Sequence, residues 1–267
     1  MSRRIGSQTD NMNVKMQKLG GWGGVILVVL LWTSCMGEGG HMVRYSSRRA
    51  VVQESPWKSL YVTDDSIPEG YLISSSDLEG REDLKAGDCC VVEYRVDFAE
   101  QYKDGVYAAE IGRCDLLPKW LLNPKMTDTA AILVNEQFPT LLFTKGRYMK
   151  GRYFLDIQFK EHQDSRLDVL ELSYNPKEVL QIGDDGVRVY NLYLRAWKEG
   201  VEDSTQVSSR VVPTAFVIED FTEETGRREK ELGYETLNFV INYPQRFNTD
   251  TTACIWAITD TVSIGLD

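Results

Sequence analysis

The amino-acid sequence predicts an all-β protein, and three observations support this fold class. Apolar and polar residues alternate along several stretches, residues typical of turns separate these stretches, and long helical patterns are scarce. Successive side chains of a strand point to opposite faces of a sheet, so such alternation is typical of half-buried strands. Many short strands with regular turns favour a barrel or a sandwich. We therefore expect a small OB-like Greek-key barrel followed by an antiparallel β-sandwich.

The barrel is expected between residues 50 and 123. Its clearest strand is "CCVVEYRVDF" (89–98), in which even-numbered positions from Cys90 to Phe98 are apolar and odd-numbered positions from 93 to 97 are charged. Five strands in a segment of this size fit an OB-type barrel. The other four strands are expected at 50–53, 59–63, 70–75 and 107–113.

The sandwich is expected between residues 126 and 267. An Asp-Gly step tolerates the positive φ of a tight hairpin, so Asp184, Asp185 and Gly186 in "IGDDGVRV" are interpreted as turn formers. The clearest strands here are "LDIQFK" (155–160), "TLNFVINY" (236–243) and "CIWAITDTVSI" (254–264).

Two stretches interrupt the strand pattern. Residues 114–128 hold two prolines and a Trp-Leu-Leu cluster, and we place the division between the two domains there. Residues 222–232, "TEETGRREKEL", are the best helical candidate, but Gly226 inside them weakens the prediction.

The N-terminal region has the parts of a secretory signal peptide. Lys15 and Lys18 precede a run of eight apolar residues, 25–32, and the small residues Thr33 and Ser34 close it. A membrane-spanning helix needs about 20 apolar residues, so this run is too short to span a bilayer comfortably. The sequence therefore predicts a cleaved signal at residues 1–34.

Cys35 gives the signal a more specific interpretation. The window "LWTSC" looks like a bacterial lipobox, in which the signal is cut before a cysteine whose sulfur then carries diacylglycerol. It departs from the usual pattern at Trp32, and the alternative is an ordinary signal peptide with an unrelated cysteine near the cut. We expect lipidation of Cys35, a flexible tether at 35–49, and a cell-envelope protein anchored to the outer membrane by its lipid.

The charge of the chain excludes one class of partner. The formal net charge is −10, and removing residues 1–34, which carry a net +3, would take it to −13. Binding to phosphate backbones requires clustered Lys and Arg, so nucleic acid is not expected as a partner.

The sequence predicts no catalytic, cofactor-binding or metal-binding residues, so the protein is not expected to be an enzyme. One of the two histidines, His41, falls in the predicted tether, and the other, His162, at the polar end of a predicted strand. A His-dependent triad would need a nucleophile and a carboxylate beside His162, and no Gly-x-Ser-x-Gly elbow is present. The cysteines after Cys35 lack paired zinc-ligand spacing, and no calcium-loop motif occurs.

Four cysteines would remain in the exported chain. In an oxidising compartment they are either small buried hydrophobes or include one bridge, for instance through Cys89 or Cys114, with partners that the sequence does not assign. The other two are Cys90 and Cys254.

The sequence resembles the NigD-like lipoproteins of Bacteroidetes over nearly the whole mature chain. After the lipobox, the resemblance rests on "GYLISSSDL…REDLKAGDCCVVEYRVDF", "GRYFLDIQFKEHQDSRLDVLEL", "NLYLRAWKE" and "LNFVINY". It departs from the pattern in the long tail after Tyr243 and in the adjacent Cys89 and Cys90. The resemblance implies an OB-type domain before a β-sandwich and an envelope address. The family has no established enzymatic activity, and its namesake's association with a bacteriocin locus implies a protective or accessory role.

Three functions are therefore considered. The first is a non-catalytic envelope lipoprotein that binds a protein partner. The second is a fimbrial subunit that donates a strand, with Arg48 and Arg49 as a cleavage site. The third is a glycan-binding lipoprotein with exposed tryptophans as stacking platforms, the candidates being Trp57, Trp120, Trp197 and Trp256.

Overall fold

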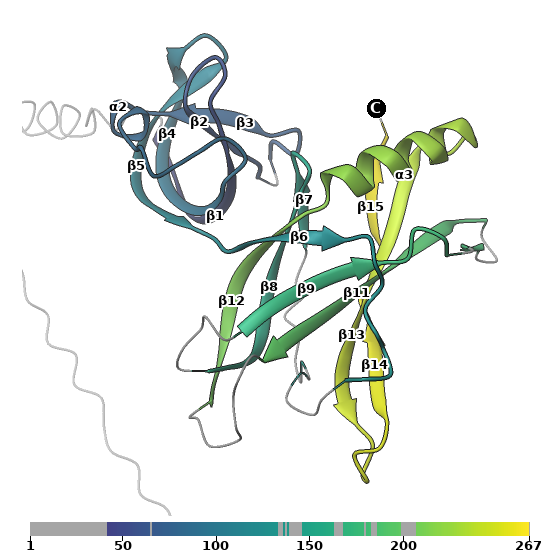
Figure 1. The fold of residues 1–267 in the computed structure, drawn as a ribbon. Coiled ribbons are helices and arrows are strands. Elements are labelled where there is room, and N and C mark those ends of the chain that lie inside the picture. The colour runs from purple at the N-terminus through teal and green to yellow at the C-terminus, as the bar shows by residue number, and fades with distance from the viewer. Residues whose placement is uncertain are drawn as a thin grey trace, which may run out of the picture. The chain divides into compact units, whose positions relative to one another are not determined.

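A computed structural model gives the fold of the chain (Figure 1). It describes residues 42–64, 66–132, 136, 138, 146–162, 168–178, 180–182, 186–198 and 207–266. The predicted signal, His41 and Cys35 lie outside these residues, as do Asp184 and Asp185. No helix among the described residues has both the length and the apolar character that crossing a membrane would require.

The first five strands form a closed barrel in the order β1-β2-β3-β5-β4. The sequence predicts a five-stranded barrel here, but not this order. All pairs are antiparallel except β3 with β5. A short helix, α2, lies between β3 and β4 in the chain. The elements are β1 (Met42–Gln53), β2 (Ser59–Val62), β3 (Tyr71–Ser74), α2 (Ser76–Glu79), β4 (Cys89–Lys103) and β5 (Val106–Leu116).

The barrel interior follows from the alternation along β4. Its even-numbered residues from Cys90 to Val96 are buried, while Arg95 is exposed on the other face. Side chains from all five strands complete this core, among them Val52, Leu60, Ile73 and Ala109.

The predicted tether overlaps the first strand and is corrected here. Residues 42–49 belong to β1, and Met42–Tyr45 pair in antiparallel register with Asp97–Tyr94 of β4. The interpretation as a tether rested on the Gly, Ser and charged residues of this segment. The backbone pairs along β4 in spite of that composition, because a strand at a barrel surface needs few apolar side chains.

The second part of the chain is a ten-stranded sheet with order β14-β13-β11-β9-β6-β12-β8-β7, where β10 and β15 pair with β11 and β13. One helix, α3, follows β12. The elements are β6 (Lys119–Asn123), β7 (Arg147–Met149), β8 (Arg152–His162), β9 (Asp168–Tyr174), β10 (Gln181–Ile182), β11 (Arg188–Lys198), β12 (Val207–Val217), α3 (Glu219–Glu231), β13 (Thr236–Phe247), β14 (Cys254–Ile258) and β15 (Val262–Gly265).

The fold class is confirmed as all-β, but the sandwich arises differently from the prediction. One sheet curls so that its two halves enclose a common core, and several pairs are parallel: β6 with β12, β6 with β9, and β11 with β13. Strand β6 lies within the range predicted for the barrel domain, but it belongs to this sheet and joins its two halves. Alternation within a strand does not report the direction of its neighbours, which explains why the parallel pairs were not predicted.

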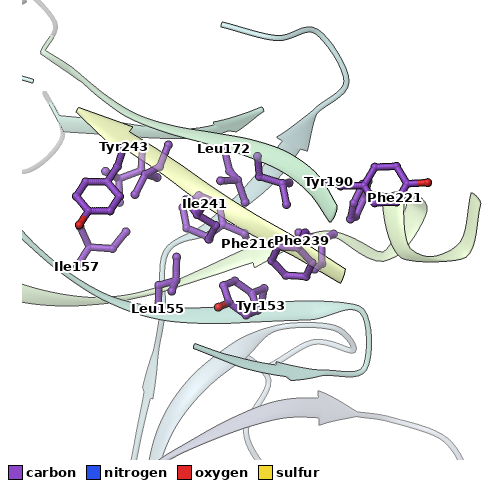
Figure 2. Close-up of a cluster of buried hydrophobic side chains, with 14 of the residues drawn as sticks. Tyr153, Leu155, Ile157, Leu172, Tyr190, Phe216, Phe221, Phe239, Ile241 and Tyr243 are labelled. Atoms are coloured by element: carbon purple, nitrogen blue, oxygen red, sulfur yellow. The ribbon is translucent and has the colours of Figure 1, made fainter. Parts of the chain in front are cut away.

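The core of the sheet is aromatic and aliphatic (Figure 2). Tyr153, Leu155 and Ile157 of β8 lie on one side of the labelled cluster, with Phe239 and Ile241 of β13 among the residues that complete it. The ring of Tyr153 meets Phe239 edge-on, with 5.3 Å between centroids. Edge-to-face pairs of this kind stabilise a core beyond the area that they bury.

Helix α3 packs one face on the sheet, and it begins three residues before the predicted range. Its buried residues are Phe221, Thr222, Thr225, Gly226 and Glu229, which share one side of a helix. A Cβ at Gly226 would lie 2.8 Å from Cδ2 of Leu266, so glycine permits the C-terminal segment to approach the helix.

Barrel and sheet share a small apolar cluster. Val51 and Cys89 of the barrel contact Met149, Phe154 and Ala215 of the sheet. Three polar links accompany it: Arg49 pairs with Asp156, Lys119 Nζ lies 3.1 Å from Asp88 Oδ1, and Arg147 donates to the Thr63 carbonyl at 2.8 Å.

Candidate functional site

The predicted site residue, Cys35, lies outside the described part of the chain, so its lipidation stays a prediction. His162 is the last residue of β8, where its backbone pairs with Val207. Gly186 has φ +76°, as expected for the turn predicted there. Within the residues that the structure describes, no group of three or more His, Cys, Asp or Glu could hold a metal ion.

Four cysteines of the described chain are free thiols. Cys89, Cys90 and Cys114 are buried, and Cys254 is partly exposed. Cys90 and Cys114 occupy diagonal positions on β4 and β5, since Val92 pairs with Cys114 and Cys90 with Leu116. Burial raises the pKa of Cys89 to about 11, so this thiol is protonated at neutral pH. Cys89, Cys90 and Cys114 therefore act as small core side chains, one of the two alternatives that the sequence left open.

The tryptophans do not form a shared stacking surface in the described structure. Trp57 is 40% exposed, but the ammonium of Lys103 lies 4.1 Å from its ring centroid and covers one face of the ring. Trp120 packs against the core of the sheet, and Trp256 meets Tyr193 edge-on at 5.9 Å. For Trp197, only the backbone in β11 is described. The geometry therefore does not favour the glycan-binding hypothesis.

A polar cluster holds the β2–β3 connection against the barrel. Asp64 accepts hydrogen bonds from the amides of Ser66 and Ile67 at 2.6 and 2.8 Å, and from the Tyr71 hydroxyl at 3.1 Å. The hydroxyls of Tyr71 and Tyr94 lie 2.7 Å apart. Burial opposes ionisation of Asp64, but these donors outweigh it and lower its pKa. Burial likewise raises the pKa of Tyr94 to about 12, so the phenols stay protonated and the cluster is structural.

Three buried charged residues, Arg195, Glu136 and Glu229, are also engaged in structure. Arg195 is fully buried and binds both carboxylate oxygens of Glu136 at 2.7–2.9 Å, together with Thr127 and two backbone carbonyls of the segment after β6. On α3, the buried Glu229 accepts from Arg188 at 2.8 Å and from Tyr190. These groups are therefore held by partners within the fold.

The most distinctive surface is a groove beside the start of α3. It has a volume of about 290 Å³ and combines an apolar floor with two carboxylates. We call it the α3 groove and define it by its lining: Leu121, Leu122, Pro124, Tyr174, Val217, Asp220, Phe221 and Glu224.

Strand β6 positions the apolar part of the α3 groove. Trp120 and Leu122 pack toward the core of the sheet, so the intervening Leu121 points to the outer face, where 75% of it is exposed. Its neighbour in register on β12 is Val217, and Phe221 follows at the start of α3. The sequence did not predict this site. Apolar residues of "KWLLN" fall on both faces of the strand, so the pattern does not show which of them is exposed.

Helix α3 supplies the charge. Asp220 and Glu224 stand four residues apart, on the same side of the helix, and both are exposed. Burial raises the pKa of Tyr174, and the negative charges of Glu224 and Asp220 raise it further, while Arg228 opposes them. The groove lining contains no Lys or Arg. The charged groups of the groove lining are therefore carboxylates alone, and Arg228, which acts on Tyr174, is not part of the lining.

Two other hollows are less suited to one class of ligand. A hollow of about 380 Å³ between barrel and sheet combines Glu93 and Asp115 with Arg113, and one of about 330 Å³ on the barrel mixes Arg44 and Arg95 with Glu93. Charges of both signs line each of these hollows, including Glu110 in the second, whereas the α3 groove is lined by carboxylates alone.

The fold is shared with solved structures of proteins from Bacteroidetes. An uncharacterized protein from Parabacteroides merdae matches with a TM-score of 0.65 and 22% identity, over 84% of this chain and 100% of that chain. A candidate lipoprotein from Bacteroides fragilis matches with a TM-score of 0.53 and 12% identity, over 85% and 98%. A NigD-like immunity protein from Bacteroides caccae gives a TM-score of 0.44 and 11% identity, over 83% and 93%.

No protein-family model matches the sequence, and no curated protein matches it. The structural matches therefore define the class of protein: an OB-type barrel joined to a curled β-sheet, as in the Bacteroidetes proteins above. The fold that the resemblance to Bacteroidetes lipoproteins implied is confirmed by the matches to the Parabacteroides merdae and Bacteroides fragilis structures.

Proposed function

We propose that this chain is a non-catalytic lipoprotein of the cell envelope, held to the outer membrane by a lipid on Cys35, which acts by binding a protein partner. The observation that carries the proposal is the "LWTSC" window after a short apolar run. The Bacteroides fragilis match, itself described as a candidate lipoprotein, supports the same address. An accessory or protective role agrees with two features of the folded chain. Its buried polar groups are used to stabilise the fold, and the α3 groove is open at the surface, where a partner can bind.

Metabolic labelling tests the anchor. Cells that express the full chain are grown with an alkyne-tagged palmitate, and the purified protein is probed for the tag. Wild type is expected to carry the label and to sediment with the outer membrane, whereas Cys35→Ala is expected to lose the label, because the acylated sulfur is gone. Cys254→Ala is the matched control, since it removes a partly exposed cysteine elsewhere. Label retained in Cys35→Ala, or none in wild type, would overturn the proposal.

A further inference from the structure

We infer that the α3 groove binds a segment of a protein partner in which a Lys or Arg lies beside a large apolar side chain. The inference rests on the proposed protein-binding role and adds the chemistry of the partner. It depends on three features of the described residues: an exposed leucine on an inner strand, an apolar floor, and unpaired carboxylates on the rim.

The first feature is the exposure of Leu121. Strand β6 has hydrogen-bonded neighbours on both sides, so Leu121 is not a residue of a sheet edge. Its side chain is 75% exposed, and Val217 beside it is half-buried. Single exposed leucines are common on protein surfaces, but a leucine that continues an apolar groove provides a contact that a partner can bury.

The second feature is the floor of the α3 groove. Phe221 is buried below it, and its ring meets Tyr174 edge-on at 5.0 Å. These rings belong to the packed core of the sheet, so the floor is formed before a partner arrives. A preformed apolar site reduces the ordering cost of binding.

The third feature is the charge on the rim. Of the acidic residues in the first turns of α3, Glu219 is paired with Arg152 at 2.8 Å, whereas Asp220 and Glu224 have no ion pair among the described residues. A cationic group that approaches the groove meets two carboxylates and no competing Lys or Arg in the lining. An anionic partner would be repelled. Charge complementarity therefore selects a basic segment, and the apolar floor selects its neighbouring side chain.

The size of the site favours a segment over a folded ligand. A volume of about 290 Å³ lies just below the usual range for small-molecule pockets, and the groove is partly open to solvent. Such a space accommodates side chains that project from a peptide. The acidic chain as a whole, with net charge −10, further favours a cationic partner.

Fluorescence polarisation with defined peptides tests the inference. The purified full-length chain is titrated into a fluorescein-labelled hexapeptide of alternating leucine and lysine. Two peptides serve as probes of specificity: one with serine in place of leucine and one with glutamate in place of lysine. Saturable binding is expected for the leucine–lysine peptide alone, and its affinity is expected to fall as salt increases.

Matched variants locate the binding site. Leu121→Asp and Glu224→Lys are each expected to weaken binding by at least about tenfold, as for residues central to a contact. Leu232→Asp changes an exposed leucine outside the groove, and Glu223→Lys changes the adjacent exposed carboxylate, so both are expected to stay within about twofold of wild type. Thermal unfolding of all four variants verifies that they fold.

Several results would overturn the inference. The first is that binding of the leucine–lysine peptide does not saturate. The second is that Glu223→Lys and Glu224→Lys weaken peptide binding equally. The third is that Leu121→Asp leaves the peptide affinity unchanged. If the wild-type chain forms a dimer that Leu121→Asp abolishes, a second copy of the chain occupies the α3 groove, and the inference is also overturned. Palmitate labelling does not depend on the groove, so a labelled protein that ignores the peptide would refute this inference and leave the lipid anchor standing.

Discussion

The buried pair of Arg195 and Glu136 gives a stringent test of how the sheet is held together. Arg195 is fully buried, and its guanidinium donates hydrogen bonds to Thr127, Asp128, Ala131 and Glu136, which all follow β6 in the chain. Replacing it with alanine removes the cation that Arg195 supplies to the carboxylate of Glu136, which is itself 1% exposed. Breaking one partner of a buried ion pair costs about 3–5 kcal/mol.

The expected effect on thermal stability follows from this free energy. Each kcal/mol lowers Tm by about 2–4 °C in a domain of about 150–250 residues, so Arg195→Ala is expected to lower Tm by about 6–20 °C. Circular dichroism during heating measures the shift. The double variant Arg195→Met with Glu136→Leu is expected to regain much of the loss, because neither charge is then left buried alone.

An exposed ion pair provides the control. Arg113 and Asp115 of β5 form an ion pair whose side chains are 67% and 47% exposed. Arg113→Ala is therefore expected to cost no more than about 1 kcal/mol. If Arg195→Ala costs as little as Arg113→Ala, the argument that the buried pair clamps the segment after β6 to the sheet is refuted.

Three further predictions concern the core, the thiols and pH. Phe239→Ala empties a fully buried site between Tyr153 and Phe221, and urea unfolding is expected to show a loss of about 3–5 kcal/mol; a loss below about 1 kcal/mol would mean that the site is not packed as described. Brief alkylation of the native protein at pH 8, read by peptide mass spectrometry, is expected to modify Cys254 before Cys89, whose pKa is raised to about 11 by burial; equal rates would contradict the burial. The lowered pKa of Asp64 stabilises the fold above the unfolded value of about 3.9, and this stabilisation is lost as pH falls through the lower folded value. The stability difference between wild type and Asp64→Asn is therefore expected to shrink in acid, and a constant difference between pH 7 and 3 would argue against an ionised, hydrogen-bonded Asp64.

The barrel was predictable because its strands carry their information locally. Along β4, buried and exposed residues alternate as the sequence does from Cys90 to Val96, and five such strands define an OB-type barrel. Local patterns do not contain the order in which distant strands meet. The insertion of β6 between β9 and β12 depends on packing from both sides. The sequence "KWLLN" shows no alternation from which this position could be predicted.

Helix α3 and the groove beside it illustrate the same limit. Gly226 lowers the helical propensity of residues 219–231, but the space it leaves is filled by Leu266 from the end of the chain. The α3 groove joins residues from β6, β9, β12 and α3, which span more than one hundred positions in sequence. Its acidic residues could be read from the sequence, but not their proximity to Leu121. The prediction of lipidation at Cys35, in contrast, rests on a motif that needs no fold, and it stays a prediction.

The position of β6 also determines how this chain can be divided. Its five residues follow the barrel directly in sequence but supply the strand that closes the gap between β9 and β12. A fragment that starts after residue 123 would leave two neighbouring strands with exposed backbone donors and acceptors, which invites aggregation. A fragment that ends there would carry an unpaired apolar tail. Barrel and sheet are therefore interdependent. A proteolytic cut after residue 123 would separate β6 from the sheet in which it pairs and would have both of these effects.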